Sequence, residues 1–272
     1  MSHAPATAKL NLALAVGAAR PDGKHEVATV LQRLALCDRI SIEPAARLSV
    51  RGFADDTLVA AALRSLADEA GVAPRWRATI DKTLPVAAGL GGGSSDAATA
   101  LRLANATLDE QLPHERLHAL AAGLGADLPF FLVQGPQLGT GDGSELAPLD
   151  LPQDYWVLLL LPRDAAKPST AAVYAAFDAR GGPDGFAERR VALLAALHGA
   201  RRARDLAALP RNDLASSPLA AELEQRGAFR ADVTGAGPVV YGLFLRRETA
   251  AAARRAVRGR GRTWLTVPAW YG

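Results

Sequence analysis

The sequence predicts an α+β protein of two domains, and three observations lead to this prediction. The first half of the chain mixes segments with strand-like alternation and segments with helical spacing. Pro148 and Pro152 enclose an acidic turn that marks a boundary, which gives domains of residues 1–151 and 152–272. Beyond this boundary a strand, several helices, two strands, a helix and a strand follow, an order that suits a β-α-β-β-α-β domain.

The elements of the first domain follow from the spacing of its apolar residues. Trp76 and Ile80 belong to a segment in which apolar and polar residues alternate, as in a half-buried strand. Leu58, Ala62 and Leu66 recur at helical spacing. We expect strands at residues 9–16, 38–44 and 75–81 and helices at residues 56–70, 94–105 and 114–122.

The second domain is expected to begin with a strand that is buried on both faces. Residues 155–161 are apolar without interruption, which is typical of such a strand. The alternation of helices and strands after it suits a ferredoxin-like domain. We expect strands at residues 155–161, 228–233, 238–245 and 262–267 and helices at residues 169–179, 185–197, 217–227 and 248–257.

A glycine-rich stretch between Pro85 and Leu101 is the strongest indication of function. Its four glycines fall within five positions, and residues without a Cβ let backbone N–H groups approach a bulky anion. Ser94 and Ser95 follow as expected helix N-cap residues, and an alanine-rich run suited to a buried helix comes next. Loop, cap and helix dipole together predict a phosphate site rather than a flexible surface turn.

This loop differs from the two common nucleotide-binding patterns. A Walker A loop ends in Gly-Lys-Ser/Thr, and no lysine follows these glycines. A Rossmann pattern fits the glycines loosely, but it requires a βαβ unit with an acidic residue about twenty positions further on.

Several segments of the chain, in the same order, resemble those of the GHMP kinases (galactose, homoserine, mevalonate and phosphomevalonate kinases). The stretch Gly-Leu-Gly-Gly-Gly-Ser-Ser-Asp-Ala-Ala is similar to one branch, the diphosphocytidyl-methylerythritol kinases of the non-mevalonate isoprenoid pathway. The other segments that carry the resemblance are Ala8–Leu12, Arg20–Glu26, Leu124–Phe131, Asn212–Leu214 and Thr234–Gly237.

The resemblance implies a fold, a reaction and two cofactors. The implied fold has a ribosomal-S5-domain-2-like N-terminal domain that binds ATP and a ferredoxin-like C-terminal domain. The implied reaction is ATP-dependent phosphorylation of the 2-hydroxyl of 4-diphosphocytidyl-2-C-methyl-D-erythritol. Mg²⁺ is expected to be bound mainly by the phosphates of ATP, because this ion keeps its waters, and no residue is assigned to it. The implied ATP-binding residues are Pro85, Gly89, Leu90, Gly91, Gly92, Gly93, Ser94 and Ser95.

Asp127 and Lys9 are the candidate catalytic residues. Asp127 precedes Pro129, so we expect a fixed loop with the apolar Phe130 and Phe131 behind it. Such an aspartate commonly caps its own turn, whereas the resemblance implies that Asp127 takes the proton of the substrate hydroxyl and that Lys9 holds charge beside it. Lysine is rare in this chain, which has 31 basic residues, and each lysine therefore merits attention: Lys9, Lys24, Lys82 and Lys167.

The candidate substrate-binding residues are Asn11, Lys24, His25 and Tyr174. A histidine after a Pro-Asp-Gly turn is commonly an exposed loop residue, but the resemblance implies that His25 contacts the cytosine ring, with Asn11 nearby. Lys24 replaces the tyrosine that the family carries before this histidine, so one stacking wall of the pocket is in doubt. Lysine in its place offers a cation near the diphosphate or over the ring. Tyr174 matches the other stacking aromatic of the family.

Three further residues are candidates for supporting the substrate-binding residues without touching the substrate themselves: Asn212, Thr234 and Gly235. For Asn212 a purely structural role is an equal alternative. Ala236 stands where the family has a serine, so a hydroxyl is lost, and we expect weaker contact to the substrate there rather than lost activity.

Composition bounds the remaining classes of function. Hydrophobic content of 49% indicates a globular protein, and the single cysteine, Cys37, excludes an intrachain disulfide and fits a reducing, cytoplasmic compartment. Apolar runs are too short to span a membrane. The net charge is +3, and the arginine-rich run at residues 254–262 is expected to be the solvated face of a helix and turn.

We therefore expect small-molecule partners, ATP and the cytidine-linked substrate, with no nucleic acid and no membrane, in a monomer or weak homodimer. The alternatives are a GHMP kinase for another small alcohol, which Lys24 favours, and an RNA-binding protein that uses the S5-like module.

Overall fold

Two long strands, β1 (Ser2–Ala19) and β2 (His25–Pro44), pair with each other in the first half of the chain. The computed structural model describes residues 2–165 and 169–269. Lys167, one of the four lysines singled out in the sequence, lies outside the described residues. Both strands are longer than the predicted strands at 9–16 and 38–44. Residues 6–17 of β1 are buried without a break, so no alternation marks the ends of this strand in the sequence.

A six-stranded sheet has the order β3-β4-β2-β5-β6, with β1 beside β2. The prediction of β4 is confirmed, and Ile80 of β4 lies opposite Ile40 in an antiparallel pair. β3, β5 and β6 were not predicted, because strands of three or four residues are too short to show a period. The bounds are β3 (Ser49–Arg51), β4 (Trp76–Asp81), β5 (Gln137–Thr140) and β6 (Glu145–Pro148).

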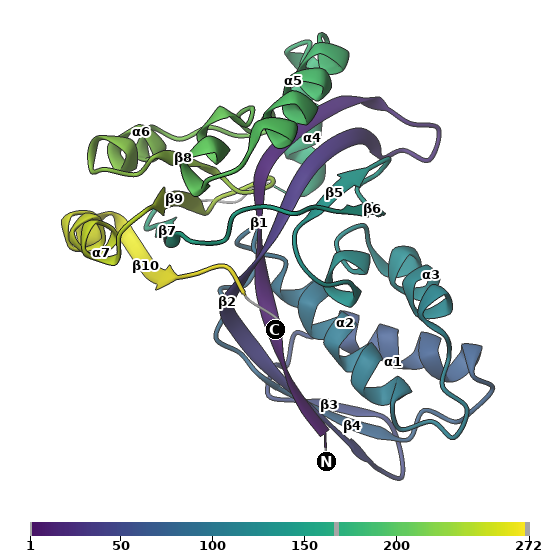
Figure 1. Ribbon diagram of the computed structural model, residues 1–272. Helices are drawn as coiled ribbons and strands as arrows, with labels where there is room; N and C mark the ends of the chain where they lie inside the picture. The colour runs from purple at the N-terminus through teal and green to yellow at the C-terminus, as the bar shows by residue number, and fades with distance from the viewer. Residues whose placement is uncertain (1, 166–168, 270–272) are drawn as a thin grey trace. The chain divides into compact units, whose positions relative to one another are not determined.

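The internal contacts of the chain divide it into two units. The first unit holds the residues up to Ala8, Leu36–Val86 and Gly91–Gln134. Three helices of this unit lie together on one side of β3 and β4 (Figure 1), and the helices predicted at 56–70 and 114–122 are confirmed. The bounds are α1 (Leu58–Glu69), α2 (Gly92–Asn105), α3 (His114–Leu124) and the short helix η1 (Pro129–Leu132).

The start of α2 corrects one expectation from the sequence. The helix begins at Gly92, and its N-cap is Gly91 in the left-handed region, with φ of 69°. Ser94 and Ser95 therefore lie inside the first turn and do not cap the helix. Without a Cβ, Gly91 can take the left-handed conformation that the turn into the helix requires, which explains why a glycine caps it although two serines follow.

The second unit holds Lys9–Ala35, Ala87–Leu90 and the chain from Gly135 onward. It contains a four-stranded antiparallel sheet of order β10-β7-β9-β8. This is the strand order of a β-α-β-β-α-β domain, so the ferredoxin-like prediction is confirmed. The strands are β7 (Trp156–Pro162), β8 (Arg230–Val233), β9 (Val240–Phe244) and β10 (Gly261–Thr266).

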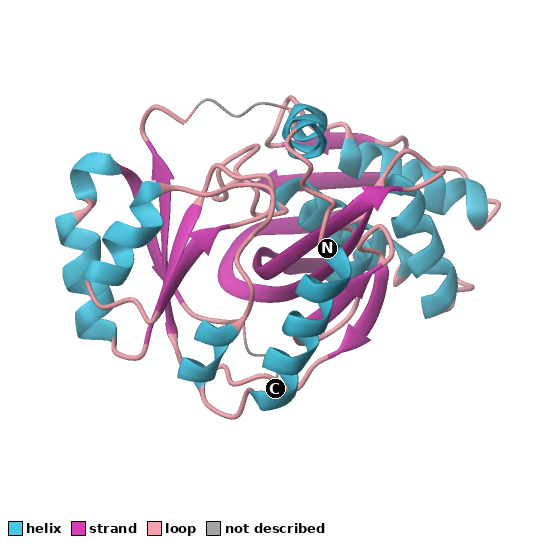
Figure 2. Cartoon of the chain, turned by 90° about the horizontal axis from the view of Figure 1, so that it is seen from above, coloured by secondary structure: helices cyan, strands magenta, loops and turns pink. Residues whose placement is uncertain are grey.

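Helices lie along one face of this sheet (Figures 1 and 2). Leu158 and Leu160 of β7 pack in one core cluster with Leu223 and Ala250 from two of these helices. Val157 and Leu159 on the opposite face are also fully buried, which confirms the prediction of a strand buried on both faces. Of the helices in the second unit, α6 (Pro218–Gln225) and α7 (Arg247–Ala256) are the two that contribute to this cluster. The others are α4 (Thr170–Ala179), α5 (Phe186–Gly199), η2 (Ala203–Ala208) and η3 (Arg258–Arg260).

Candidate active site

The glycine-rich loop runs between Pro85 and the start of α2. Gly89 and Gly91 both have left-handed backbone angles, with φ of 82° and 69°. The first N–H groups of a helix have no partner inside it, so the start of α2 offers N–H donors and the positive end of the helix dipole to an anion. Leu90 is fully buried and anchors the loop from within. These features suit a loop that binds phosphate.

Gly89, itself part of the second unit, lies against the backbone of the turn after β8 and has no room for a side chain. A Cβ at this position would lie 2.8 Å from the carbonyl oxygen of Thr234 and 2.9 Å from that of Gly237. Both neighbours are backbone atoms, which cannot rotate away as a flexible side chain can. Glycine at position 89 is therefore required by close approach as well as by its backbone angle.

Lys9 and Asn11 form a buried polar network on β1. The Lys9 Nζ donates to Asn11 Oδ1 at 2.7 Å, and the Asn11 side chain donates to Thr29 Oγ1 at 2.8 Å. The backbone N–H of Asn11 donates to Thr234 Oγ1 at 3.0 Å, and the N–H of Lys9 donates to the carbonyl of Leu90 at 2.9 Å. The structure thus brings Lys9, Asn11 and Thr234 together beside the loop residue Leu90.

Asn212 holds the turn that follows β8. Its side-chain amide donates to the carbonyl oxygens of Val233 and Gly235, at 2.9 Å and 2.7 Å. A Cβ on Gly235 would lie 3.2 Å from Asn11 Oδ1, so this turn reaches the network of Lys9 and Asn11. Asn212 thereby supports the turn through its backbone.

Asp127 lies in the turn between α3 and η1 and is half-buried. Pro129, Phe130 and Phe131 behind it are buried, and the two rings pack edge to face with centroids 5.2 Å apart. The expected apolar residues behind Asp127 are therefore present. Asp127 belongs to the first unit and Lys9 to the second.

His25 is surrounded by groups from α4. Its ring lies 4.6 Å from the ring of Tyr174 between centroids, and its Nε2 is 2.9 Å from Asp178 Oδ1. The side chain of His25 is only 9% exposed. The resemblance to the family predicted that His25 and Tyr174 bind the base, and the structure places their rings in contact. Asp178 also belongs to this cluster, because its carboxylate pairs with His25. The sequence did not predict Asp178.

Lys24 does not share this cluster. Its Nζ forms an ion pair with Asp142 in the turn between β5 and β6, and its side chain is 48% exposed. Burial works against ionisation of Asp142, but the hydrogen bonds from Lys24 and Ser144 outweigh it and lower the pKa of Asp142 to about 2.

The described part of the chain contains no group of three or more His, Cys, Asp or Glu side chains that could hold a metal ion. Lys82, whose Nζ lies beside Gly92 at the start of α2, pairs with two carboxylates, those of Asp38 and Asp96. This set of donors fits an ion held mainly by nucleotide phosphates rather than a cage of protein ligands.

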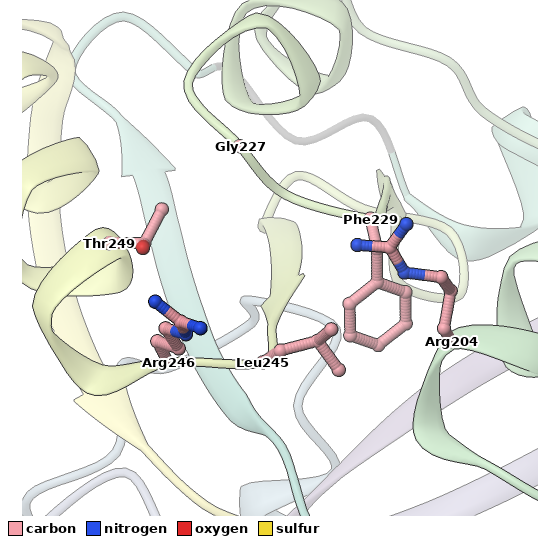
Figure 3. A pocket seen from close by; sticks show the side chains of 6 residues that line it. All are labelled: Arg204, Gly227, Phe229, Leu245, Arg246 and Thr249. Atoms are coloured by element: carbon pink, nitrogen blue, oxygen red, sulfur yellow. The ribbon is translucent and has the colours of Figure 1, made fainter.

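A separate hollow in the second unit contains none of the predicted site residues. It is lined by Arg204, Gly227, Phe229, Leu245, Arg246 and Thr249, as Figure 3 shows.

Comparison with known proteins places the chain in a family. The model of the GHMP kinases N terminal domain matches residues 57–135, and that of the GHMP kinases C terminal domain matches residues 193–263. The chain belongs to the GHMP kinase family. The predicted two-domain GHMP kinase fold is thereby confirmed.

Curated relatives align with nearly the whole length of this GHMP kinase. It is 38% identical to the 4-diphosphocytidyl-2-C-methyl-D-erythritol kinase of Solidesulfovibrio magneticus, over an alignment that covers 94% of this chain and 93% of the relative. It is 38% identical to the enzyme of the same name from Nocardia farcinica, over 94% of this chain and 89% of the relative.

Solved structures agree with this assignment. A crystal structure of 4-(cytidine 5'-diphospho)-2C-methyl-D-erythritol kinase matches with a TM-score of 0.80 and 30% identity, over 99% of this chain and 100% of that chain. The mevalonate kinase of Methanococcus jannaschii matches with a TM-score of 0.78 at 12% identity, which shows the shared fold. No helix within residues 2–165 and 169–269 has the length and apolar character to cross a membrane.

Proposed function

We propose that this GHMP kinase uses ATP to phosphorylate the 2-hydroxyl of 4-diphosphocytidyl-2-C-methyl-D-erythritol, a step of the non-mevalonate isoprenoid pathway. The observation that carries the proposal is the match over more than nine-tenths of the chain to relatives that bear the name of this kinase. The family models on either side of residue 151 support domains at residues 1–151 and 152–272.

The glycine-rich loop is proposed to bind the phosphates of ATP. Its left-handed glycines and the start of α2 supply backbone N–H donors, and the helix dipole favours negative charge at this point. Gly91, Gly92 and Gly93 supply amides without side chains, and Ser94 and Ser95 add amides in the first turn of the helix. Mg²⁺, held mainly by the phosphates, would neutralise charge on the transferred group.

Asp127 and Lys9 are proposed to act on the substrate hydroxyl. The hydroxyl oxygen forms the new bond to the γ-phosphorus, the bond from that phosphorus to the ADP oxygen breaks, and the hydroxyl proton passes to the Asp127 carboxylate. Lys9 stabilises the negative charge that spreads over the reacting oxygens. Its burial and its bond to Asn11 support this role, because they hold the ammonium in one orientation.

His25 and Tyr174 are proposed to receive the cytosine ring. Their contact at 4.6 Å supports an aromatic site, and Asp178 holds the orientation of the His25 ring. Lys24, engaged with Asp142, leaves this site with one aromatic wall fewer than the family pattern has. We further propose a cytoplasmic enzyme, which its single cysteine supports, and a monomer or weak homodimer.

A competition assay tests the function. The purified chain is given labelled ATP, Mg²⁺ and an equimolar mixture of 4-diphosphocytidyl-2-C-methyl-D-erythritol, mevalonate, homoserine and galactose. We expect label in the cytidine compound alone. Label in another alcohol would indicate a different GHMP kinase, and retention of RNA on filters without any transfer would indicate a binding protein.

A further inference from the structure

Three charged side chains are buried together at the start of α2, and the proposed chemistry does not use them. The Lys82 Nζ donates to Asp38 Oδ2 at 2.7 Å and to Asp96 Oδ2 at 2.6 Å. The side chains are 15%, 0% and 2% exposed for Lys82, Asp38 and Asp96. Removing three charges from water costs free energy, and their pairing offsets this cost only in part, so the cluster contributes little to the stability of the fold.

The cluster ties down both ends of the glycine-rich loop. Asp38 Oδ1 accepts the backbone N–H groups of Thr83 and Leu84, at 2.5 Å and 2.7 Å, directly before the loop begins. Asp96 stands in the first turns of α2, directly after the loop ends. One ammonium group therefore connects the segment that enters the loop to the helix that leaves it.

The cluster also lies close to the phosphate-binding backbone itself. A Cβ on Gly92, the first residue of α2, would lie 3.3 Å from the Lys82 Nζ. Asp96 Oδ1 is buried without a hydrogen-bond partner among the described residues. An unsatisfied buried carboxylate oxygen at this place costs stability, which indicates that the cluster is not built for stability alone.

We infer that Lys82 is a positioning residue that, through Asp38 and Asp96, holds the glycine-rich loop in the conformation that binds the nucleotide phosphates. The inference rests on the proposed ATP site. Two carboxylates share one ammonium, so the cluster is negative when all three groups are ionised. This negative charge beside an anion site opposes nucleotide binding, and a proton on the cluster relieves it.

The proton has an identifiable place. Burial raises the pKa of Asp96, the hydrogen bond from Lys82 lowers it and the charge of Asp38 raises it, and together these effects bring the pKa to about 7. Burial lowers the pKa of Lys82, but its bonds to the two carboxylates outweigh this, so the ammonium stays charged. Asp96 is therefore expected to lose its proton as pH rises through about 7, which weakens ATP binding.

The first test removes the ammonium. Lys82→Met should weaken ATP binding about 10- to 100-fold, the effect expected when a binding group is displaced by about an ångström. It should raise KM for ATP and leave KM for the alcohol unchanged. Arg77→Met is the matched control, because it removes a cation from an ion pair between β4, the strand that leads to Lys82, and β2, where Arg77 and Glu43 are 38% and 35% exposed. Calorimetry, with circular dichroism to verify folding, gives the readout.

The second test changes the charge without changing the shape. Asp96→Asn should bind ATP at pH 8 on the order of threefold more tightly than wild type and should match it at pH 6, the effect of one partly screened charge. Ionisation of ATP itself is the same for both proteins and cancels. This variant decides the matter if Lys82→Met fails to fold.

The outcomes are distinct. A folded Lys82→Met protein with unchanged ATP affinity, or an Asp96→Asn protein with the pH dependence of wild type, overturns the inference while the ATP site stands. Wild-type protein that fails to bind ATP overturns the proposed function and this inference with it.

Discussion

Lys9 and Asn11 show how polar side chains are kept inside an otherwise apolar strand. Both are buried, at 4% and 6% exposure, and each has a hydrogen-bond partner within the network. Arg230 of β8, which is 1% exposed, donates to the carbonyl of Leu12 and so connects β1, the strand that carries both residues, to β8. The hydrogen bond to Asn11 orients Lys9 before any ligand arrives.

At this scale we predict that Asp127→Asn lowers kcat by about 10²–10⁴-fold, because a general base contributes a factor of this size. ATP affinity should stay the same, since the change keeps the volume of the side chain. Lys9→Ala should lose a comparable amount, and the double variant should be little worse than either single one, because groups acting on one step are not additive. Losses that multiply in the double variant would contradict the shared role, and an Asp127→Asn enzyme with full turnover would return Asp127 to a turn-capping role. Single-turnover kinetics distinguish these results.

Lys24→Tyr should tighten binding of the cytidine substrate at least fivefold, because stacking on an aromatic side chain is worth about 1–3 kcal/mol per base. The fold should tolerate the change, since the Lys24 side chain is 48% exposed and Ser144 still donates to Asp142. Calorimetric titration with substrate measures the effect, and unchanged ATP affinity serves as the control. Weaker binding with a flatter salt dependence would mean that Lys24 holds the diphosphate, and unchanged affinity would place Lys24 outside the pocket.

At the scale of elements, the loop before α2 depends on glycine for two separate reasons. Gly91 supplies a left-handed helix cap, and Gly89 passes within contact of the carbonyls of Thr234 and Gly237. Serine commonly caps helices, but Ser94 and Ser95 lie inside the first turn, and Gly91 is the N-cap. The caps of α4 and α6 differ, because the side chains of Ser169 and Ser217 accept from the amides of Ala172 and Leu219.

Gly89→Ala should lower the free energy of unfolding by about 2 kcal/mol or more, since a left-handed alanine costs about 1–2 kcal/mol and the Cβ meets two fixed oxygens. Gly123→Ala on α3 is the control, because a Cβ there meets nothing within 4 Å. That control should be neutral or stabilise the protein by up to about 1 kcal/mol, through the higher helix propensity of alanine. Urea unfolding of both variants measures the difference, and equal stability would show that the loop adjusts to a side chain at position 89.

At the scale of the whole molecule, a bound nucleotide should stabilise the chain against unfolding. ATP at 100 times its Kd contributes about 2.7 kcal/mol, which corresponds to a rise in Tm of roughly 5–10 °C for a chain of this size. Thermal unfolding with and without ATP and Mg²⁺ measures the shift, and sodium sulfate at equal ionic strength is the control for nonspecific anion effects. A shift no larger than that of sulfate would contradict a specific ATP site.

The sequence by itself determined the features that depend on neighbouring residues. Helical spacing identified α1 and α3, alternation identified β4, and an unbroken apolar run identified β7 with both faces buried. The glycine-rich motif and the other family segments identified the family and the proposed reaction. All of these are local patterns, in which the chemistry and its spacing lie within a few turns of chain.

Only the tertiary structure decided the features that join distant residues. Asp178 reaches His25 across 153 positions, and Asp38 reaches Lys82 across 44. A lysine or an aspartate in the sequence is by itself a surface charge, and its role depends on partners that the fold supplies. For the same reason, the prediction that Ser94 and Ser95 cap α2 was wrong. The left-handed turn at Gly91 and the close approach of backbone to Gly89 are set by packing, which no local pattern records.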